Sequence, residues 1–481
     1  MSPTYGVVFS SLLYTAAEMR ERRLSGGKAS RLAAFSWILY DFSNTIFSVT
    51  ILSFYFPLWV EEQVRRGGLF SGAGLVNSAT AVSALLVVLT APVLGAVADL
   101  RQRRVPYLIL LTIIAVALTA ALDVTGGVMV GLALFVAADL AYQSALIFYN
   151  ALLPVVSAGR GAGRISGYGT AVGYVGTILG LVVLTYFVEN GETVRRLLGP
   201  LGGWLETGDE VYSNAFVPTA VIYLVFSIPA FFFVPDPAVR ERRPVVLGVA
   251  YRDVVSTVKN LRAYAGVGTF ILATVLYTDA ANTAIANMAL YGRVVFEMDG
   301  TQVRNLLLFS TVFAVVGSAG FGLLTDRVGP KMSLVGVLVL WLVAIVLAAA
   351  AWGAWMLFLA GPIVGIALGG MWTVGRVMLV ALSPPGKLGE FFGLFSLAGK
   401  VSAVFGPALT AVLLFVFGGG AYGYRISIAS LAIIMALGLF FLLRVPDARP
   451  ERNVDEFAPK TGTPLDSPAP RAEDVRHEGE G

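Results

Sequence analysis

The chain has 481 residues, of which 57% are hydrophobic and only 13% are charged. A soluble domain carries about 25% charged residues, and this much apolar side chain does not fit inside a soluble core. The composition therefore excludes a soluble globular protein and indicates a membrane protein. With no Cys and a single His, His477, disulfides, thiolate metal sites and a Ser–His–Asp triad are excluded, and no metal or cofactor is expected.

The chain begins with a stretch that does not have the pattern of a targeting signal. Residues Tyr5–Ala17 are mildly apolar, but the basic residues follow them at positions 20–31, the reverse of a cleavable signal peptide. We expect residues 1–34 to be a cytoplasmic segment. Either residues 1–18 are a loose extension, or translation starts at Met19.

Apolar runs long enough to cross a bilayer then recur along the chain, and they predict twelve membrane helices in an all-α integral membrane fold. The first six are expected at residues 35–60, 71–98, 105–122, 128–156, 166–188 and 215–234, within an N-terminal bundle spanning 35–234. The second six are expected at residues 266–290, 306–325, 332–351, 353–382, 391–417 and 424–444, within a C-terminal bundle spanning 266–444. A basic cytoplasmic linker, partly an amphipathic helix, is expected at 235–265, and a disordered cytoplasmic tail at 445–481.

The distribution of basic residues predicts the orientation. With the N-terminus inside, 25 Lys and Arg residues fall in inside segments and 7 in outside loops. This excess places both termini in the cytoplasm, and we expect a multi-pass protein of a prokaryotic inner membrane. The net charge of +4 is explained by these loops, so no nucleic-acid partner is expected.

Two halves of the chain repeat each other. The first predicted helix contains Asp41-x-x-Asn44-Thr45 and the seventh contains Asp279-x-x-Asn282-Thr283. The loops after the second and eighth helices both carry Gly-x-x-x-Asp followed by basic residues, and the fifth and eleventh helices share glycine spacing. Parallel repeats predict two bundles related by a pseudo-two-fold axis along the membrane normal.

The loop Gly322–Lys331 resembles the loop signature of the major facilitator superfamily, although the first-half copy has Gln102 in place of the second Gly. Within that superfamily, the segments Trp37–Asn44, Tyr149–Pro154 and Glu390–Lys400 resemble the autophagy-related vacuolar amino-acid effluxer family and its prokaryotic relatives. The resemblance implies alternating-access transport of a small polar organic solute, with an amino acid as first candidate. It also implies that helices one, four, seven and ten line a central cavity.

Ionisable residues inside a membrane are costly, so they are candidates for function. Five ionisable residues are predicted inside the membrane, namely Asp41, Asp139, Asp279, Arg376 and Lys400. The first four lie one on each of the four cavity-lining helices. In each half, an Asp, an Asn and a Thr share one helical face, where they can bind a polar solute. A desolvated carboxylate also takes up and releases protons readily, which suits proton coupling. The predicted substrate or proton site comprises Asp41, Asn44, Thr45, Asp139, Asp279, Asn282, Thr283 and Arg376. The alternative is that these residues cap helix breaks or bridge helices.

Two basic residues are ambiguous. Arg376 suits a substrate carboxylate, or else an internal partner, for which Asp139 and Asp279 are the candidates. Lys400 is predicted to be a counter-ion or coupling switch.

Carboxylates at the cytoplasmic ends of helices two and eight predict gating contacts. Each can bind a neighbouring helix N-terminus or nearby bases and so latch the two halves together. The predicted gating residues are Asp99, Arg103, Asp326, Arg327, Lys331 and Glu390. The better signature match favours Asp326 as the stronger latch.

Three other functions are alternatives to transport. They are an intramembrane lipid-processing enzyme, a drug or lipid exporter of the same fold, and a scaffold or receptor. Without Cys or a membrane His, an enzyme would depend on carboxylates and Lys, so no enzyme activity is predicted. The expected partners are a small-molecule substrate, the lipid bilayer and protons, and a monomer is expected.

Overall fold

The computed structural model describes residues 30–448 except 68–70, 102, 125–126, 209–210, 238–246, 260, 262–263, 265 and 385. The predictions for the N-terminal extension and for most of the C-terminal tail lie outside these residues.

The membrane helices of the first half follow the predicted spans closely. The first begins at Arg31 and is capped by Ser30, whose hydroxyl accepts a hydrogen bond from the Leu32 backbone N–H. It passes through a π-helical stretch before continuing. The elements are α2 (Arg31–Phe47), η2 (Ser48–Tyr55), α3 (Phe56–Gly67), α4 (Gly72–Arg101), α5 (Val105–Ala121), α6 (Val128–Ala151), α7 (Leu153–Ser157), α8 (Ala162–Glu189), α9 (Gly191–Leu198) and α10 (Phe216–Phe233).

The second half repeats this plan after a short linker helix. A capping box, in which Asp299 and Gln302 exchange side-chain and backbone hydrogen bonds, starts its second membrane helix. The elements are α11 (Leu247–Lys259), α12 (Val267–Phe296), α13 (Gly300–Val328), α14 (Pro330–Ala349), α15 (Ala354–Leu382), α16 (Leu388–Phe417) and α17 (Ala421–Leu443).

Eleven helical segments of the described chain are long and apolar enough to cross a membrane. The twelfth predicted helix is α12, which has 30 residues but carries Asp279 and Asn282 in its middle. It packs against α16 and α17. No strand occurs in the described residues. The predicted all-α membrane fold is therefore confirmed.

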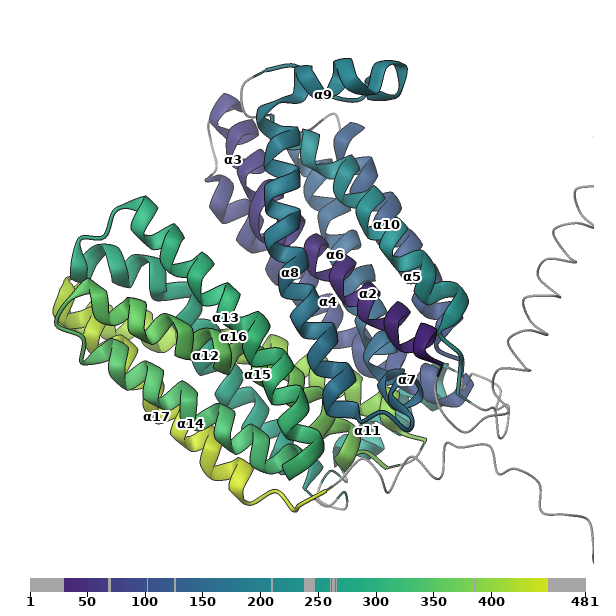
Figure 1. Cartoon of the computed structure of the whole chain (residues 1–481), viewed down its shortest axis with the longest axis vertical. Coiled ribbons are helices and arrows are strands. Elements are labelled where there is room, and N and C mark those ends of the chain that lie inside the picture. Colours follow the sequence, from purple (N-terminus) through teal and green to yellow (C-terminus); the bar gives the residue numbers. More distant parts are fainter. Residues whose placement is uncertain are drawn as a thin grey trace, which may run out of the picture.

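The helices form two bundles that touch at one end. Figure 1 shows α2–α10 (purple to teal) and α12–α17 (green to yellow) meeting near α11 and diverging toward the end that carries α3 and α9. Across this junction α8 packs against α13, and α4 against α16. The joined end is the one predicted to face the cytoplasm.

Glycines make this junction tight. A methyl group on Gly322 would lie 2.6 Å from the Gly163 carbonyl oxygen, and one on Gly389 would lie 2.5 Å from the Gly95 carbonyl oxygen. The backbones of facing helices are therefore in direct contact, which side chains larger than hydrogen would prevent.

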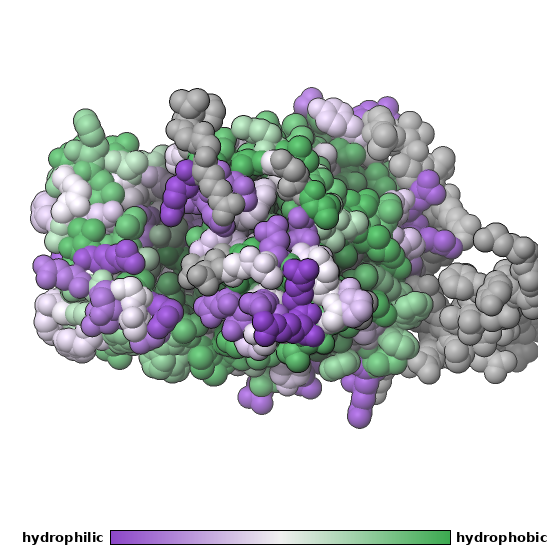
Figure 2. Space-filling view, turned by 90° about the horizontal axis from the view of Figure 1, so that it is seen from above, coloured by the Kyte–Doolittle hydropathy of each residue, from purple (hydrophilic) through white to green (hydrophobic). Residues whose placement is uncertain are grey.

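The outer surface is apolar where lipid would contact it. Large hydrophobic side chains such as Phe232, Phe415 and Ile433 are more than half exposed. Figure 2, viewed from the diverging end, shows hydrophobic residues around the sides and polar residues gathered on the end face. This distribution fits a bilayer around the sides.

The linker helix α11 contacts both bundles. Val254 packs against Ala96 and Val97 of α4. Thr257 accepts a hydrogen bond from the Lys387 ammonium group, just before α16, over 2.7 Å. The linker thus lies across the joined end.

Candidate functional site

The centre of the candidate site is a buried ion pair that joins the two bundles. Arg376 on α15 donates through Nη1 and Nη2 to Asp41 Oδ2 on α2, over 3.2 and 3.1 Å. The two residues are 9% and 7% exposed. The partner of Arg376 is therefore Asp41, and the prediction of Asp139 or Asp279 as its internal partner is wrong.

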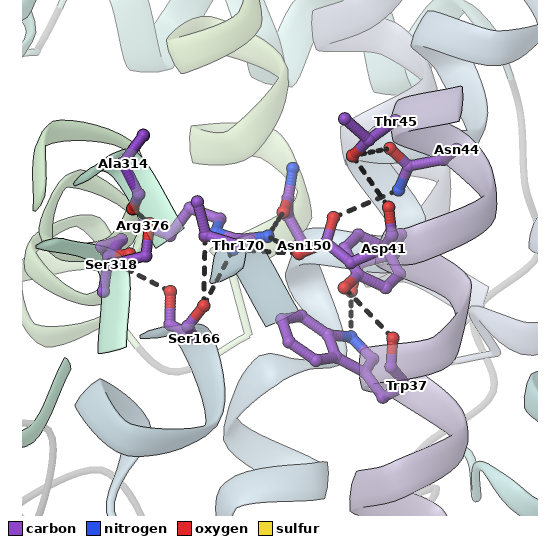
Figure 3. Close-up of polar contacts among 12 residues, drawn as sticks. Trp37, Asp41, Asn44, Thr45, Asn150, Ser166, Thr170, Ala314, Ser318 and Arg376 are labelled. Carbon is purple, nitrogen blue, oxygen red and sulfur yellow. Dashed lines mark hydrogen bonds and ion pairs between the residues drawn. The ribbon is translucent and has the colours of Figure 1, made fainter. Parts of the chain in front are cut away.

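Other first-half groups complete the surroundings of the guanidinium (Figure 3). Its nitrogens donate to Asn150 Oδ1 on α6, and to the Ser166 carbonyl oxygen and Thr170 Oγ1 on α8. Its Cζ lies 5.3 Å from the centre of the Trp37 ring. A buried charge requires many hydrogen-bond partners, and the Arg376 guanidinium of the second half finds them on three helices of the first half.

Aromatic rings fix the helix that carries Asp41. Trp37 stacks on Tyr149 with ring centres 4.4 Å apart. Its Nε1 donates to the Tyr149 carbonyl oxygen, and the Tyr149 hydroxyl donates to the Trp37 carbonyl oxygen. These reciprocal bonds join α2 to α6 and position Asp41 one turn beyond Trp37.

The predicted triad of the first half is assembled. Asn44 Nδ2 donates to Asp41 Oδ1 over 3.2 Å, and Thr45 Oγ1 donates to the Asp41 carbonyl oxygen over 2.7 Å. Glycines of α8 make room for it, because a methyl on Gly169 would lie 2.7 Å from Asp41 Oδ2 and one on Gly173 would lie 2.7 Å from Thr45 Oγ1.

The triad of the second half has different partners. Asp279 Oδ1 accepts the Gly406 backbone N–H of α16 over 2.9 Å. Asp279 and Thr283 are each 1% exposed, whereas Asn282 is half-buried. In the described residues no basic side chain forms an ion pair with Asp279.

Asp139 lies on α6 in contacts internal to the first bundle. Its carboxylate accepts hydrogen bonds from Ser83 Oγ over 2.6 Å and from Gln143 Nε2 over 3.1 Å. Lys400 on α16 is half-buried and forms no ion pair with another described residue. The functional roles of both stay predictions.

Two carboxylates at the joined end bind helix N-termini of the opposite bundle. Asp99, at the end of α4, accepts the backbone N–H groups of Gly389 and Glu390 over 2.9 and 2.8 Å. Asp326, at the end of α13, accepts those of Gly163 and Arg164 over 2.8 and 3.0 Å. The two contacts are related by the internal repeat, and each places a negative charge at a positive helix end.

The basic residues around these carboxylates differ from the prediction. Asp99 pairs with Arg104 over 3.3 Å, whereas Arg103 is exposed. Arg104 is buried, and this desolvation lowers the pKa of its guanidinium.

Asp326 lies 4.0 Å from Arg164, and Arg327 is exposed. Lys331 pairs with Asp447 over 3.8 Å, and the Glu390 carboxylate pairs with Lys387 over 3.4 Å. The helix-end contacts were thus predicted, and the bases beside the two carboxylates are Arg104 and Arg164 rather than Arg103, Arg327 and Lys331.

The family described as "Vacuole effluxer Atg22 like" matches residues 29–455. The chain belongs to this family. Its members and its fold are those of major facilitator superfamily transporters, as the resemblance in the sequence indicated.

Relatives of this Atg22-like chain come from bacteria and fungi. It is 23% identical over 436 residues to the "Uncharacterized MFS-type transporter YxiO" of Bacillus subtilis, covering 89% of this chain and 98% of the relative. It is 22% identical over 320 residues to autophagy-related protein 22-1 of Neosartorya fischeri, covering 60% of this chain and 49% of the relative.

Solved structures share the fold. The human organic anion transporter MFSD10 is similar with a TM-score of 0.65 at 14% identity, over 88% of this chain and 99% of that one. The transporter FucP in its outward conformation is similar with a TM-score of 0.60 at 15% identity, over 86% of this chain and 98% of that one. At these identities the likeness concerns the fold alone.

Residues that the sequence did not single out as site members complete the cluster in the Atg22-like chain. Asn150, Ser166 and Thr170 contact Arg376. Asn150 belongs to a segment that carried the family resemblance, and this was the available signal.

Proposed function

We propose that the chain transports a small polar organic solute, with an amino acid as first candidate, by alternating access, and that the Asp41–Arg376 pair is its binding centre. The observation that supports this proposal is the position of the pair. A carboxylate of one bundle and a guanidinium of the other meet in a buried cluster of polar groups. The family description, a vacuole effluxer, agrees with transport.

An amino acid carries the two charges that this pair carries. Its carboxylate can take the planar fork of Arg376, and its ammonium group can take the carboxylate of Asp41. Because the two residues belong to different bundles, a bound amino acid would contact both. Substrate binding would then be linked to the movement of one bundle against the other.

Proton coupling follows from the same exchange of partners. When a substrate carboxylate has engaged Arg376 and the substrate ammonium group has not yet reached Asp41, Asp41 has no counter-charge in a surrounding of low dielectric. A carboxylate in that position takes up a proton. We further propose that the chain acts as a monomer in a prokaryotic inner membrane with both termini in the cytoplasm.

The test is a thermal-unfolding screen of the purified full chain. Amino acids should raise the unfolding midpoint, whereas the corresponding amino-acid amides, which lack the carboxylate, should not. Arg376→Lys keeps the charge but loses the fork, so it should weaken the amino-acid effect by about tenfold or more in concentration. Arg425→Lys on α17, which removes a guanidinium bound to the carbonyl oxygens of Ala349 and Ala351, is the matched control.

Two results would contradict the proposal. One is equal stabilisation by amides and amino acids, and the other is an undiminished amino-acid effect in Arg376→Lys. Stabilisation by lipids or hydrophobic drugs alone would instead favour a drug or lipid exporter of the same fold, and turnover of a lipid would favour the intramembrane enzyme.

A further inference from the structure

The carboxylate of Asp279 is a buried charge without a cationic side chain. It is 1% exposed in the middle of α12, and Oδ1 accepts the Gly406 N–H. Oδ2 is buried and has no hydrogen-bond partner among the described residues. The equivalent Asp41 is paired with Arg376. A lone buried carboxylate is costly, so Asp279 requires a positive charge that the described residues do not supply.

A second oxygen at the same place is also unsatisfied. Thr283 lies one turn after Asp279, and its buried hydroxyl has no partner among the described residues. In the first half the equivalent Thr45 hydroxyl donates to the carbonyl oxygen of Asp41. A Thr in a helix commonly makes this bond to the preceding turn, so its absence leaves both the hydrogen and the lone pairs of the Thr283 hydroxyl without a partner in the protein interior.

The two free oxygens lie against the same residue. A methyl group on Gly406 would overlap Thr283 Oγ1 and would lie 2.9 Å from Asp279 Oδ2. Both atoms therefore lie beside Gly406 and close to each other. The next residue, Pro407, lies inside α16 and has no N–H, so one carbonyl oxygen of the preceding turn loses its helical donor. Oxygen ligands from one carboxylate, one hydroxyl and an interrupted helix suit a hard cation.

We propose that Asp279 Oδ2 and Thr283 Oγ1, together with the α16 backbone around Gly406 and Pro407, form a binding site for a monovalent metal cation, Na⁺. One carboxylate balances one positive charge and leaves the buried site neutral. The described residues contain no group of three His, Cys, Asp or Glu side chains that could hold a metal ion, which disfavours a divalent metal.

A proton on Oδ2 would also neutralise Asp279, and the resulting O–H group could donate to Thr283 Oγ1. Protonation gives no ²²Na⁺ binding, so a direct binding measurement separates it from Na⁺. Lys400 lies six residues before Gly406 on α16, about 9 Å along the helix, and is a second alternative source of charge. Na⁺ contacts both oxygens at once, and it would join α12 to α16 inside the second bundle. This site is separate from the Arg376 cluster and does not depend on the proposed substrate.

The experiment measures Na⁺ binding to the purified full chain directly. Radioactive ²²Na⁺ should bind saturably in choline chloride buffer of constant ionic strength, and NaCl should raise the unfolding midpoint relative to choline chloride. Asp279→Asn should abolish both effects, and Thr283→Val should weaken binding by about tenfold or more. Thr45→Val removes the equivalent hydroxyl of the first half and should bind Na⁺ as the unchanged chain does.

A second pair of variants tests the close approach of these oxygens to Gly406. Gly406→Ala would displace Thr283 Oγ1 and crowd Asp279 Oδ2, whereas Gly399→Ala on the same helix meets no atom within 4 Å. The proposal predicts loss of ²²Na⁺ binding in the first variant and retention in the second. It is overturned if ²²Na⁺ does not bind saturably, or if Asp279→Asn and Gly406→Ala bind it normally. Because binding is read without substrate, these outcomes are distinguishable from failure of the amino-acid screen.

Discussion

At the scale of the residue, Arg376 shows how one charge can be kept inside the membrane. It has hydrogen-bond acceptors from α2, α6 and α8, all in the opposite bundle. A buried ion pair contributes little net stability, but removing one partner costs about 3–5 kcal/mol because the other charge is left uncompensated. The pair therefore resists opening until another ion replaces one of its members, as a charged substrate would.

Replacement of Asp41 tests the coupling role of this pair. Asp41→Asn keeps the size and the hydrogen bonding of the side chain but cannot titrate, so substrate uptake by the variant should lose its dependence on pH. The measurement is the initial rate of uptake into proteoliposomes as a function of external pH. Glu192→Gln, the same chemical change at an exposed residue of α9, is the control. An unchanged pH profile in Asp41→Asn would show that protons are not carried at this residue.

At the scale of the element, the sequence predicts what depends on local composition. Spans follow from apolar runs, and Asp41 and Arg376 stand out because charge is rare in a membrane helix. Asn150 and Thr170 do not stand out, since their role depends on which helices cross near Arg376. Arg103 and Arg104 are likewise indistinguishable in sequence, and only the turn between α4 and α5 directs Arg104 toward Asp99.

The crossing of α8 and α13 gives an element-scale prediction. A methyl group on Gly322 would lie 2.6 Å from the Gly163 carbonyl oxygen and 2.9 Å from the Gly167 Cα, so Gly322→Ala should separate the two helices at the joined end. Gly320→Ala, on the same helix, meets no atom within 4 Å and should be neutral.

The readout is labelling of a cysteine at Ala98, which is fully buried on α4 at this junction. Labelling by a water-soluble maleimide should become faster in Gly322→Ala and remain slow in Gly320→Ala. Equal labelling rates in the two variants would mean that the contact between Gly322 and Gly163 does not determine how tightly the joined end closes.

At the scale of the whole molecule, the two bundles are held together at one end by two carboxylates that the repeat relates. Asp99 is the more buried, with an 8% exposed side chain and Arg104 beside it, whereas the Asp326 side chain is 19% exposed. The signature match favoured Asp326 as the stronger latch, whereas burial and ion pairing favour Asp99. The rates of cysteine labelling in Asp99→Asn and Asp326→Asn would rank the two latches.

Asp326→Asn gives the last prediction. The variant loses a charge at the N-terminus of α8 and the charge-assisted bonds to Gly163 and Arg164, which contribute roughly 0.5–3 kcal/mol. A change of that size shifts a two-state population by up to about a hundredfold. Because the chain has no Cys, Ala98→Cys alone reports opening of the joined end, and its labelling should accelerate accordingly. A cysteine at the exposed Glu192 should label at an unchanged rate. If Ala98→Cys also labels at the same rate with and without Asp326→Asn, the loop anchors topology and does not gate transport.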